Sequence, residues 1–231
     1  MKLKNLGCII FARSNSKRLK KKVLREIGNT PLVLIVYSRV RKVFPKNKIV
    51  IATSKNKFDD NLVKICKKNN IKFFRGNLNN VFQRGVQCCK KFNLDAFMRV
   101  CSDRPFFYYE LANKMKKEFQ KGKYDIVTNV FPKTFPKGLT CEFIKFNTLK
   151  KVSKKNLSKK EQEHMINYFY RNSENFSIKN YKSKLSTEYK NLNLSIDNMK
   201  GLNISEKIFK KSFFNISVPT KTALKYAKEL S

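Results

Sequence analysis

The chain has 231 residues, 41% of them hydrophobic, and carries 52 Lys and Arg against 16 Asp and Glu, a formal net charge of +36. This length and apolar content suffice for one sizeable core, so we expect a single domain over residues 1–231. The positive charge excludes few kinds of partner, because nucleic acid, anionic membranes and phosphorylated small molecules would all attract a basic protein. Since much of the excess is Lys at helix-surface positions such as Lys114 and Lys117, we favour compositional bias of the source genome as its explanation.

The cysteines and the N-terminus indicate the compartment. The six cysteines show no CxxC spacing and three lie inside apolar runs, as expected of small buried side chains in a reducing environment. The apolar run after Lys2 and Lys4 is too short for the core of a signal peptide. No stretch approaches the roughly 20 apolar residues of a membrane span. We therefore expect a cytoplasmic protein without membrane segments.

The first 130 residues alternate between short apolar runs and longer amphipathic segments. Strand length and β-branched or aromatic content mark residues 6–12, 48–53, 71–74, 94–100 and 124–130. Helical spacing of apolar residues marks 32–43, 59–69, 81–91 and 110–119. Strands that alternate with helices predict an α/β fold with a mostly parallel sheet and helices on both faces.

After residue 130 the regular alternation of predicted strands and helices ends. We predict a loop running into a strand at 134–146, a helix at 159–170, strands at 175–181 and 189–196, and a terminal helix from Thr220 to Leu230 after Pro219. The strand in 134–146 need not be parallel to the others. No linker or repeat interrupts the chain, so these elements form a C-terminal mixed-strand elaboration of the same domain.

The stretch FARSNSKRLKKK, residues 11–22, follows the first predicted strand. Ligands of open α/β sheets bind beyond the carboxyl ends of the strands. Arg13, Ser16, Arg18 and Lys22 supply the guanidinium, hydroxyl and ammonium donors that a triphosphate needs. Their spacing fits neither a Walker loop nor a dinucleotide fingerprint. From these residues alone, a solvated basic loop and a phosphate-binding loop are equally good interpretations.

The order of these residues resembles the opening of the cytidylyltransferases that make CMP-activated sugar acids, close to their spore-coat polysaccharide branch. Six further segments match in the same order: VIATSKNKFDDNLVKIC, FFRGNLNNVFQR, MRVCSDRPFFYYELANKM, FPKGLTCEFI, EQEHMINYFYRN and LSIDNMKGL. Ordered matches over about residues 6–205 are more specific than any single motif. The resemblance implies a Rossmann-like fold of the nucleotide-diphospho-sugar transferase type.

The resemblance also implies a role for individual residues. By this resemblance, the residues that bind the nucleotide are Ala12, Arg13, Ser16, Arg18 and Lys22 in the opening loop and Arg75, Gly76 and Arg84 around it. The implied catalytic residues are Arg13, Lys22, Asp103 and Asp197, and the two aspartates would hold Mg²⁺. The acceptor sugar faces Glu142, His164, Tyr170 and Arg171.

Each of these residues also has a purely structural interpretation. Asp103 and Asp197 follow strand-like runs, where a carboxylate suits Mg²⁺ but equally suits the N-cap of the next helix. Glu142 has many lysines as alternative partners. His164 is the single histidine, and such a residue is more often a surface or core side chain. Tyr170 and Arg171 are equally explained by packing and pairing.

The chain departs from the family pattern in four places. Lys20 and Lys21 stand where the pattern has Pro-Gly, so the loop lacks its most flexible residue. Ser102 replaces a Gly before the metal-binding Asp, and Arg104 is an unusual cation after it. Thr140 replaces an Asp on the sugar side. The acceptor is therefore expected to differ from those of the best-known members.

These observations predict a Mg²⁺-dependent cytidylyltransferase that transfers CMP from CTP to a sugar acid for surface polysaccharide biosynthesis. Its partners are CTP, the sugar acid and a second copy in a homodimer, with no specific nucleic acid. One alternative is a nucleotide-sugar glycosyltransferase, although the expected D-x-D pair is replaced by CSDR. The other is a non-catalytic nucleic-acid-binding protein, which leaves the ordered motifs unexplained.

Overall fold

The structure, a computed structural model, describes residues 3–16 and 18–230. Its described residues form one seven-stranded sheet of order β5-β4-β1-β6-β8-β7-β9 and a separate hairpin of β2 and β3. The strands are β1 (Leu6–Phe11), β2 (Glu26–Ile27), β3 (Thr30–Pro31), β4 (Ile49–Ser54), β5 (Lys72–Gly76), β6 (Ala96–Cys101), β7 (Ile126–Thr128), β8 (Glu142–Lys145) and β9 (Ile178–Asn180). Within the large sheet, β8 is antiparallel to β6 and β7, while the other neighbouring strands are parallel.

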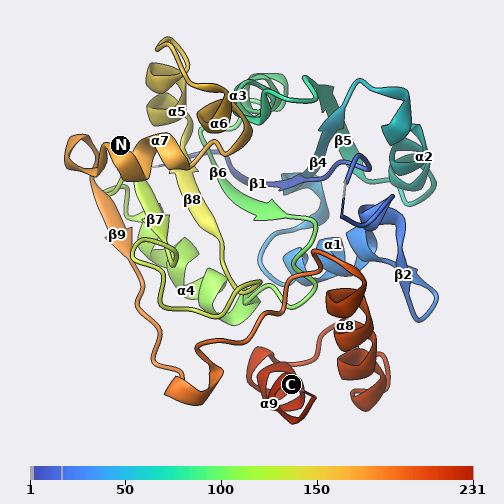
Figure 1. Ribbon diagram of the computed structural model, residues 1–231. Coiled ribbons are helices and arrows are strands. Elements are labelled where there is room, and N and C mark those ends of the chain that lie inside the picture. The colour runs from blue at the N-terminus through green and yellow to red at the C-terminus, as the bar shows by residue number, and fades with distance from the viewer. Residues whose placement is uncertain (1–2, 17, 231) are drawn as a thin grey trace.

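Helices cover both faces of this sheet. They are α1 (Leu32–Val40), α2 (Asp60–Lys68), α3 (Val81–Lys91), α4 (Tyr109–Gln120), α5 (Phe146–Val152), α6 (Lys159–Glu163), α7 (Asn167–Arg171), α8 (Met199–Lys211) and α9 (Thr220–Glu229). The core on one face includes residues of α1, α2, α4, α8 and α9, and the core on the other includes residues of α3, α5 and α7. Figure 1 shows α3, α5 and α7 across the sheet from α1, α4 and α8.

Strand β1 illustrates why the apolar runs predicted buried strands. All six of its residues are buried. Cys8 and Ile10 point into the core beneath α1, whereas Ile9 and Phe11 point into the core beneath α3. Because successive side chains of a strand face opposite sides, a strand that is covered on both faces must be apolar throughout. The predicted α/β fold, with its mostly parallel sheet and mixed-strand C-terminal part, is confirmed.

Two predictions for the C-terminal part are wrong. Residues 189–196 are not a strand: among the described residues this segment pairs with another through an isolated bridge between Lys137 and Asn193. Its alternating Leu194 and Ile196 are buried in the core without an adjacent strand to pair with. The predicted helix at 159–170 is two helices, because His164 leaves the helical conformation at φ −109° and ψ 73°. Helix α5, directly after β8, was not predicted.

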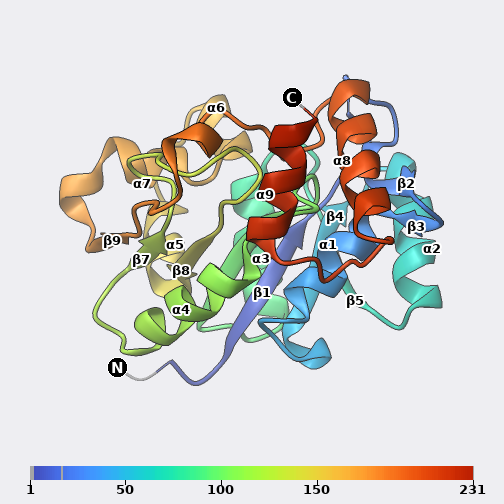
Figure 2. The same cartoon turned by 90° about the horizontal axis from the view of Figure 1, so that it is seen from below.

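The C-terminal helices are fastened to the core by Arg39 of α1. This buried guanidinium donates to the carbonyls of Ile216 and Val218, at 2.9 Å each, and to that of Phe107 at 3.1 Å. Burial lowers the pKa of Arg39 to about 10. Helix α9 begins at Thr220 after Pro219, as predicted, and lies beside α8 (Figure 2). No helix in the described part of the chain is both long and apolar enough to cross a membrane.

Candidate active site

The parallel strands bring their following loops to one edge of the sheet. The Ala12 N–H donates to the Ala52 carbonyl at 3.1 Å, so the chain after β1 stays against β4. The Ser102 N–H donates to the Phe11 carbonyl at 3.1 Å, which holds the loop after β6 against the other side of β1. The opening loop and the Asp103 segment therefore leave the sheet side by side at the edge where ligands of such sheets bind.

Lys22 joins the two predicted metal-binding aspartates. Its Nζ lies 2.9 Å from Oδ2 of Asp103 and 3.7 Å from Oδ1 of Asp197. The Ile196 N–H donates to the Asp103 carbonyl at 2.9 Å, which fixes the two aspartate segments to each other. Three residues far apart in the sequence are thus brought to one point, as the resemblance implied.

Asp197 forms ion pairs with two further cationic side chains. The Arg18 guanidinium lies 3.3 Å from its Oδ1, and the Lys137 ammonium contacts its Oδ2. We call Arg18, Lys22, Asp103, Lys137 and Asp197 the edge cluster. Burial raises the pKa of Asp197, but the hydrogen bond and charge of Lys137, the charge of Lys22 and a hydrogen bond from Ser195 outweigh it. Because the resulting pKa lies below the usual value, Asp197 is ionised at neutral pH.

The structure rules out the helix-capping interpretation of both aspartates. Asn198 is the N-cap of α8, and its side chain accepts a hydrogen bond from the Gly201 N–H at 3.0 Å. Helix α4 begins after Tyr108, several residues beyond Asp103. Neither Asp103 nor Asp197 therefore serves a helix terminus, and both carboxylates face the cations of the edge cluster.

The edge cluster also fits a magnesium ion. Asp103 and Asp197 converge on a single ammonium group, so their oxygens can converge on another cation. The described residues contain no group of three or more His, Cys, Asp or Glu placed to hold a metal. Mg²⁺ suits such a pair, because it takes one or two carboxylates and fills its other positions with water and substrate phosphate oxygens.

Arg13 and Ser16 of the opening loop have partners outside the edge cluster. Arg13 pairs with Oε1 of Glu163 at 2.5 Å rather than with the edge cluster. The Ser16 hydroxyl accepts the Leu19 N–H at 3.3 Å and so shapes the loop itself. Lys21 lies in the left-handed region at φ 54° and ψ 32°, where the family pattern has glycine. The loop thus keeps a glycine-type conformation without the glycine.

Sequence analysis missed Asp59, whose side chain holds the opening loop by a hydrogen bond. Its buried carboxylate accepts the Ser14 N–H at 2.6 Å and the Ser54 N–H at 3.0 Å. Burial raises the pKa of Asp59, but hydrogen bonds, first that of the Ser54 hydroxyl, outweigh it and the pKa lies below its usual value. An acidic residue at the start of the predicted helix 59–69, in a chain so poor in carboxylates, was the available signal.

Arg75, Gly76 and Arg84 form a wall beside the opening loop. Arg75 donates to the Ser54 carbonyl at 2.9 Å and so ties the end of β5 to the end of β4. Arg84 is buried, donates to the Asn77 carbonyl at 3.1 Å and lies 5.9 Å from the centre of the Phe11 ring. A Cβ at Gly76 would come within 2.8 Å of the Arg84 Cγ, so glycine is needed for this packing. Burial lowers the pKa of Arg84 to about 10.

A second charged group lies within the sheet, and we call Arg99, Arg104 and Glu142 the strand cluster. Arg99 of β6 and Glu142 of β8 are register partners, and the Arg99 guanidinium lies 3.1 Å from the Glu142 Oε2. Arg104 donates to the Thr140 carbonyl. Sequence analysis did not propose Arg99, although an arginine inside the otherwise apolar run LDAFMRV was a signal.

Tyr170 lies next to the strand cluster. Its hydroxyl is 2.7 Å from the Thr128 hydroxyl, and its ring stacks on Phe131 with 4.7 Å between the ring centres. Burial, followed by the negative charge of Glu142, raises the pKa of Tyr170 well above its usual value. Glu142 and Tyr170, both predicted to face the acceptor, are therefore neighbours in the structure.

The side chains of the two other predicted acceptor residues have different surroundings from this pair. His164 is exposed at the break between α6 and α7, next to Glu163, the partner of Arg13. Arg171 contacts Glu161, whose side chain completes a capping box with Ser158 at the start of α6. The EQEH segment therefore meets the opening loop through Glu163 rather than through its histidine.

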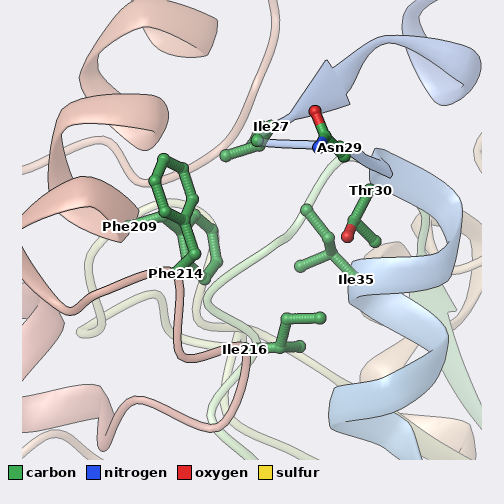
Figure 3. Close-up of a pocket in the computed structure, with 8 residues that line it drawn as sticks. Ile27, Asn29, Thr30, Ile35, Phe209, Phe214 and Ile216 are labelled. Atoms are coloured by element: carbon green, nitrogen blue, oxygen red, sulfur yellow. The ribbon is translucent and has the colours of Figure 1, made fainter.

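A cavity of about 400 Å³ lies away from both charged clusters. Figure 3 shows it between Phe209 and Phe214 on one side and the β2–β3 turn with Ile35 of α1 on the other. Its lining is mainly apolar and includes none of the predicted site residues. A triphosphate is recognised by charged donors, so the edge cluster and not this cavity is the candidate active site.

Comparison with known proteins agrees with this geometry. The model of the family described as Cytidylyltransferase matches residues 7–230. The uncharacterized protein MJ1063 of Methanocaldococcus jannaschii is 30% identical over 192 residues, which cover 83% of this chain and 78% of that protein. The spore coat polysaccharide biosynthesis protein SpsF of Bacillus subtilis is 34% identical over 167 residues, covering 69% of this chain and 68% of that protein.

Solved structures share the fold. A cytidylyltransferase from Leptospira borgpetersenii serovar Hardjo-bovis has a TM-score of 0.89 at 24% identity, covering 98% of this chain and 94% of that one. A CMP:2-keto-3-deoxy-manno-octonic acid synthetase complexed with CTP has a TM-score of 0.69 at 14% identity, covering 90% of this chain and 99% of that one. The Rossmann-like arrangement predicted from sequence is thereby confirmed.

Proposed function

The chain belongs to the cytidylyltransferase family and is a CTP-using nucleotidyltransferase; from this premise we propose that it transfers CMP to a sugar acid, with Mg²⁺, for surface polysaccharide biosynthesis. A hydroxyl oxygen of the acceptor attacks the α-phosphorus of CTP, the bond to the β-phosphate breaks, and pyrophosphate leaves as the hydroxyl proton is lost. Such a transfer needs positioning and charge neutralisation more than covalent catalysis.

The observation that carries this proposal is the convergence of Asp103, Asp197 and Lys22 at the carboxyl edge of the sheet. Lys22 and Arg18 would pair with the phosphates of CTP, while Asp103 and Asp197 would hold the metal. When bound, Mg²⁺ supplies neutralisation of phosphate charge at this point. Asp197 is already ionised there, so no proton has to leave it before a cation binds.

We place the acceptor against the strand cluster and Tyr170. Arg99 and Arg104 exceed Glu142 by one positive charge, so this part of the described structure favours an anion over a neutral sugar. The Nε atom of Arg99 is buried and lacks a hydrogen-bond partner among the described residues, so an acceptor oxygen that reached it would satisfy this donor. Support for a polysaccharide role comes from the similarity to SpsF.

Pyrophosphate release with each of the four nucleoside triphosphates, with and without a panel of sugar acids, tests the proposal. We expect release with CTP and one class of sugar acid, dependent on Mg²⁺, and a loss of at least about 100-fold in Asp103→Asn. Glu229→Gln is the control, because Glu229 pairs with Lys211 on the far helices α8 and α9. Full activity of Asp103→Asn, or no metal-dependent release with any pair, would show the mechanism to be wrong.

A further inference from the structure

Lys137 is the one member of the edge cluster that neither the opening loop nor the aspartate segments supply, and its backbone is held rigidly. Its N–H donates to the Leu192 carbonyl at 3.2 Å, and its carbonyl accepts the Leu194 N–H at 2.8 Å. The next residue, Gly138, has φ 97°, and a Cβ there would lie 2.5 Å from the Leu194 carbonyl carbon. The main chain at Lys137 therefore cannot move away from the Asp197 segment without breaking this pairing.

The side chain of Lys137, in contrast, is held loosely. Its side chain is 50% exposed, whereas that of Lys22 is 13% exposed. Water can solvate the exposed Lys137 ammonium, and Arg18 and Lys22 stay on the Asp197 carboxylate, so the ammonium leaves Asp197 at modest cost. Lys137 nevertheless contacts Oδ2 of Asp197, the oxygen that Arg18 and Lys22 leave unused and to which the Ser195 hydroxyl donates at 3.1 Å. It thus occupies a carboxylate oxygen that a metal ion would need.

We propose that Lys137 is an exchangeable counter-ion that couples metal binding to nucleotide binding, an inference that rests on the proposed function. Without ligands, its ammonium neutralises Asp197 and opposes metal binding. When the nucleotide arrives, the ammonium moves from Asp197 to the phosphates and releases Oδ2 to the metal. Metal and nucleotide then favour each other through Lys137, and by linkage each raises the affinity for the other by the same factor. Lys137 is a positioning residue in this scheme.

Mn²⁺ binding, measured by the electron paramagnetic resonance of free Mn²⁺ with and without CTP, tests this coupling. Without CTP, we expect Lys137→Met to bind Mn²⁺ about tenfold more tightly than wild type, because the competing ammonium is gone. With CTP, the gain in Mn²⁺ affinity that CTP produces should be smaller in Lys137→Met than in wild type. CTP itself should bind the variant several-fold more weakly. A defect of folding alone would weaken both ligands together.

Two control variants sharpen the measurement. Lys133→Met removes another exposed lysine of the same segment and should behave as wild type, while Lys137→Arg keeps the positive charge and should restore the coupling. Equal or weaker Mn²⁺ binding by Lys137→Met without CTP, including no binding by either protein, would overturn the proposal. Loss of Mn²⁺ binding in Asp197→Asn checks the proposed metal site separately, so the two ideas can fail independently.

Discussion

The edge cluster and the strand cluster contain the same kinds of groups and differ in their exposure. Arg18 and Lys137 in the edge cluster have side chains that are 70% and 50% exposed. Arg99 and Glu142 in the strand cluster are 11% and 2% exposed. Asp197 and Lys22 of the edge cluster are 12% and 13% exposed, so the contrast concerns its outer cations. Water can replace the partner of Arg18 or Lys137 but not the partner of Arg99. Exposure therefore makes Arg18 and Lys137 exchangeable, and burial makes the Arg99–Glu142 pair a fixed part of the sheet.

The largest expected effect comes from breaking the buried pair. Glu142→Gln keeps the shape of the side chain but leaves the buried Arg99 guanidinium uncompensated, so the free energy of unfolding should fall by about 3–5 kcal/mol. Lys137→Met, which removes an exposed cation of the edge cluster, should lower it by less than about 1 kcal/mol. Urea denaturation of both variants checks this difference. Equal losses would show that exposure does not separate the two clusters.

Asp59 tests whether burial or position in the fold determines how much a charged group stabilises the protein. It lies at the same sheet edge as the edge cluster but is buried like the strand cluster. Asp59→Asn should lower the free energy of unfolding by about 1.5–3 kcal/mol, through weaker bonds to the N–H groups of Ser14 and Ser54. The pKa of Asp59 is lowered in the folded state, so its stabilisation is present above the unfolded pKa, near 4, and is lost as the pH falls through the folded value.

Urea midpoints measured between about pH 6 and pH 2.5 follow this loss. The wild-type midpoint should fall with acidification below about pH 4, and the Asp59→Asn midpoint should fall less steeply because one of the responsible carboxylates is gone. Parallel curves for the two proteins would contradict the assignment of this pH dependence to Asp59.

The smallest effect concerns the backbone that carries Lys22 into the edge cluster. Lys21→Gly should raise the free energy of unfolding by about 0.5–1 kcal/mol, because glycine adopts φ 54° without the strain of a Cβ. Lys20→Gly is the matched control: Lys20 has no left-handed φ, so glycine there adds only freedom to the unfolded chain and should destabilise. Urea denaturation compares the two. Stabilisation by both changes, or by neither, would refute this explanation.

The part of the site that sequence predicted best lies on the parallel strands. Asp103 follows β6 and the opening loop follows β1, so their places at the carboxyl edge of the sheet follow from the parallel direction of the two strands. The two wrong predictions of secondary structure lie after residue 130. Residues 189–196 alternate like a strand, but the alternation records only which side chains reach the core. Whether a partner strand runs alongside depends on distant segments.

The sequence by itself determined the fully apolar strands, the mostly parallel sheet and the donor types of the opening loop, because these depend on periodicity and on neighbouring residues. Tertiary structure alone decided which charges meet. Lys137 reaches Asp197 through the Lys137–Asn193 bridge, and Glu142 meets Arg99 through the antiparallel register of β8 with β6. A sequence shows which charged groups a chain has, but their partners and their burial are fixed only when the strands assemble.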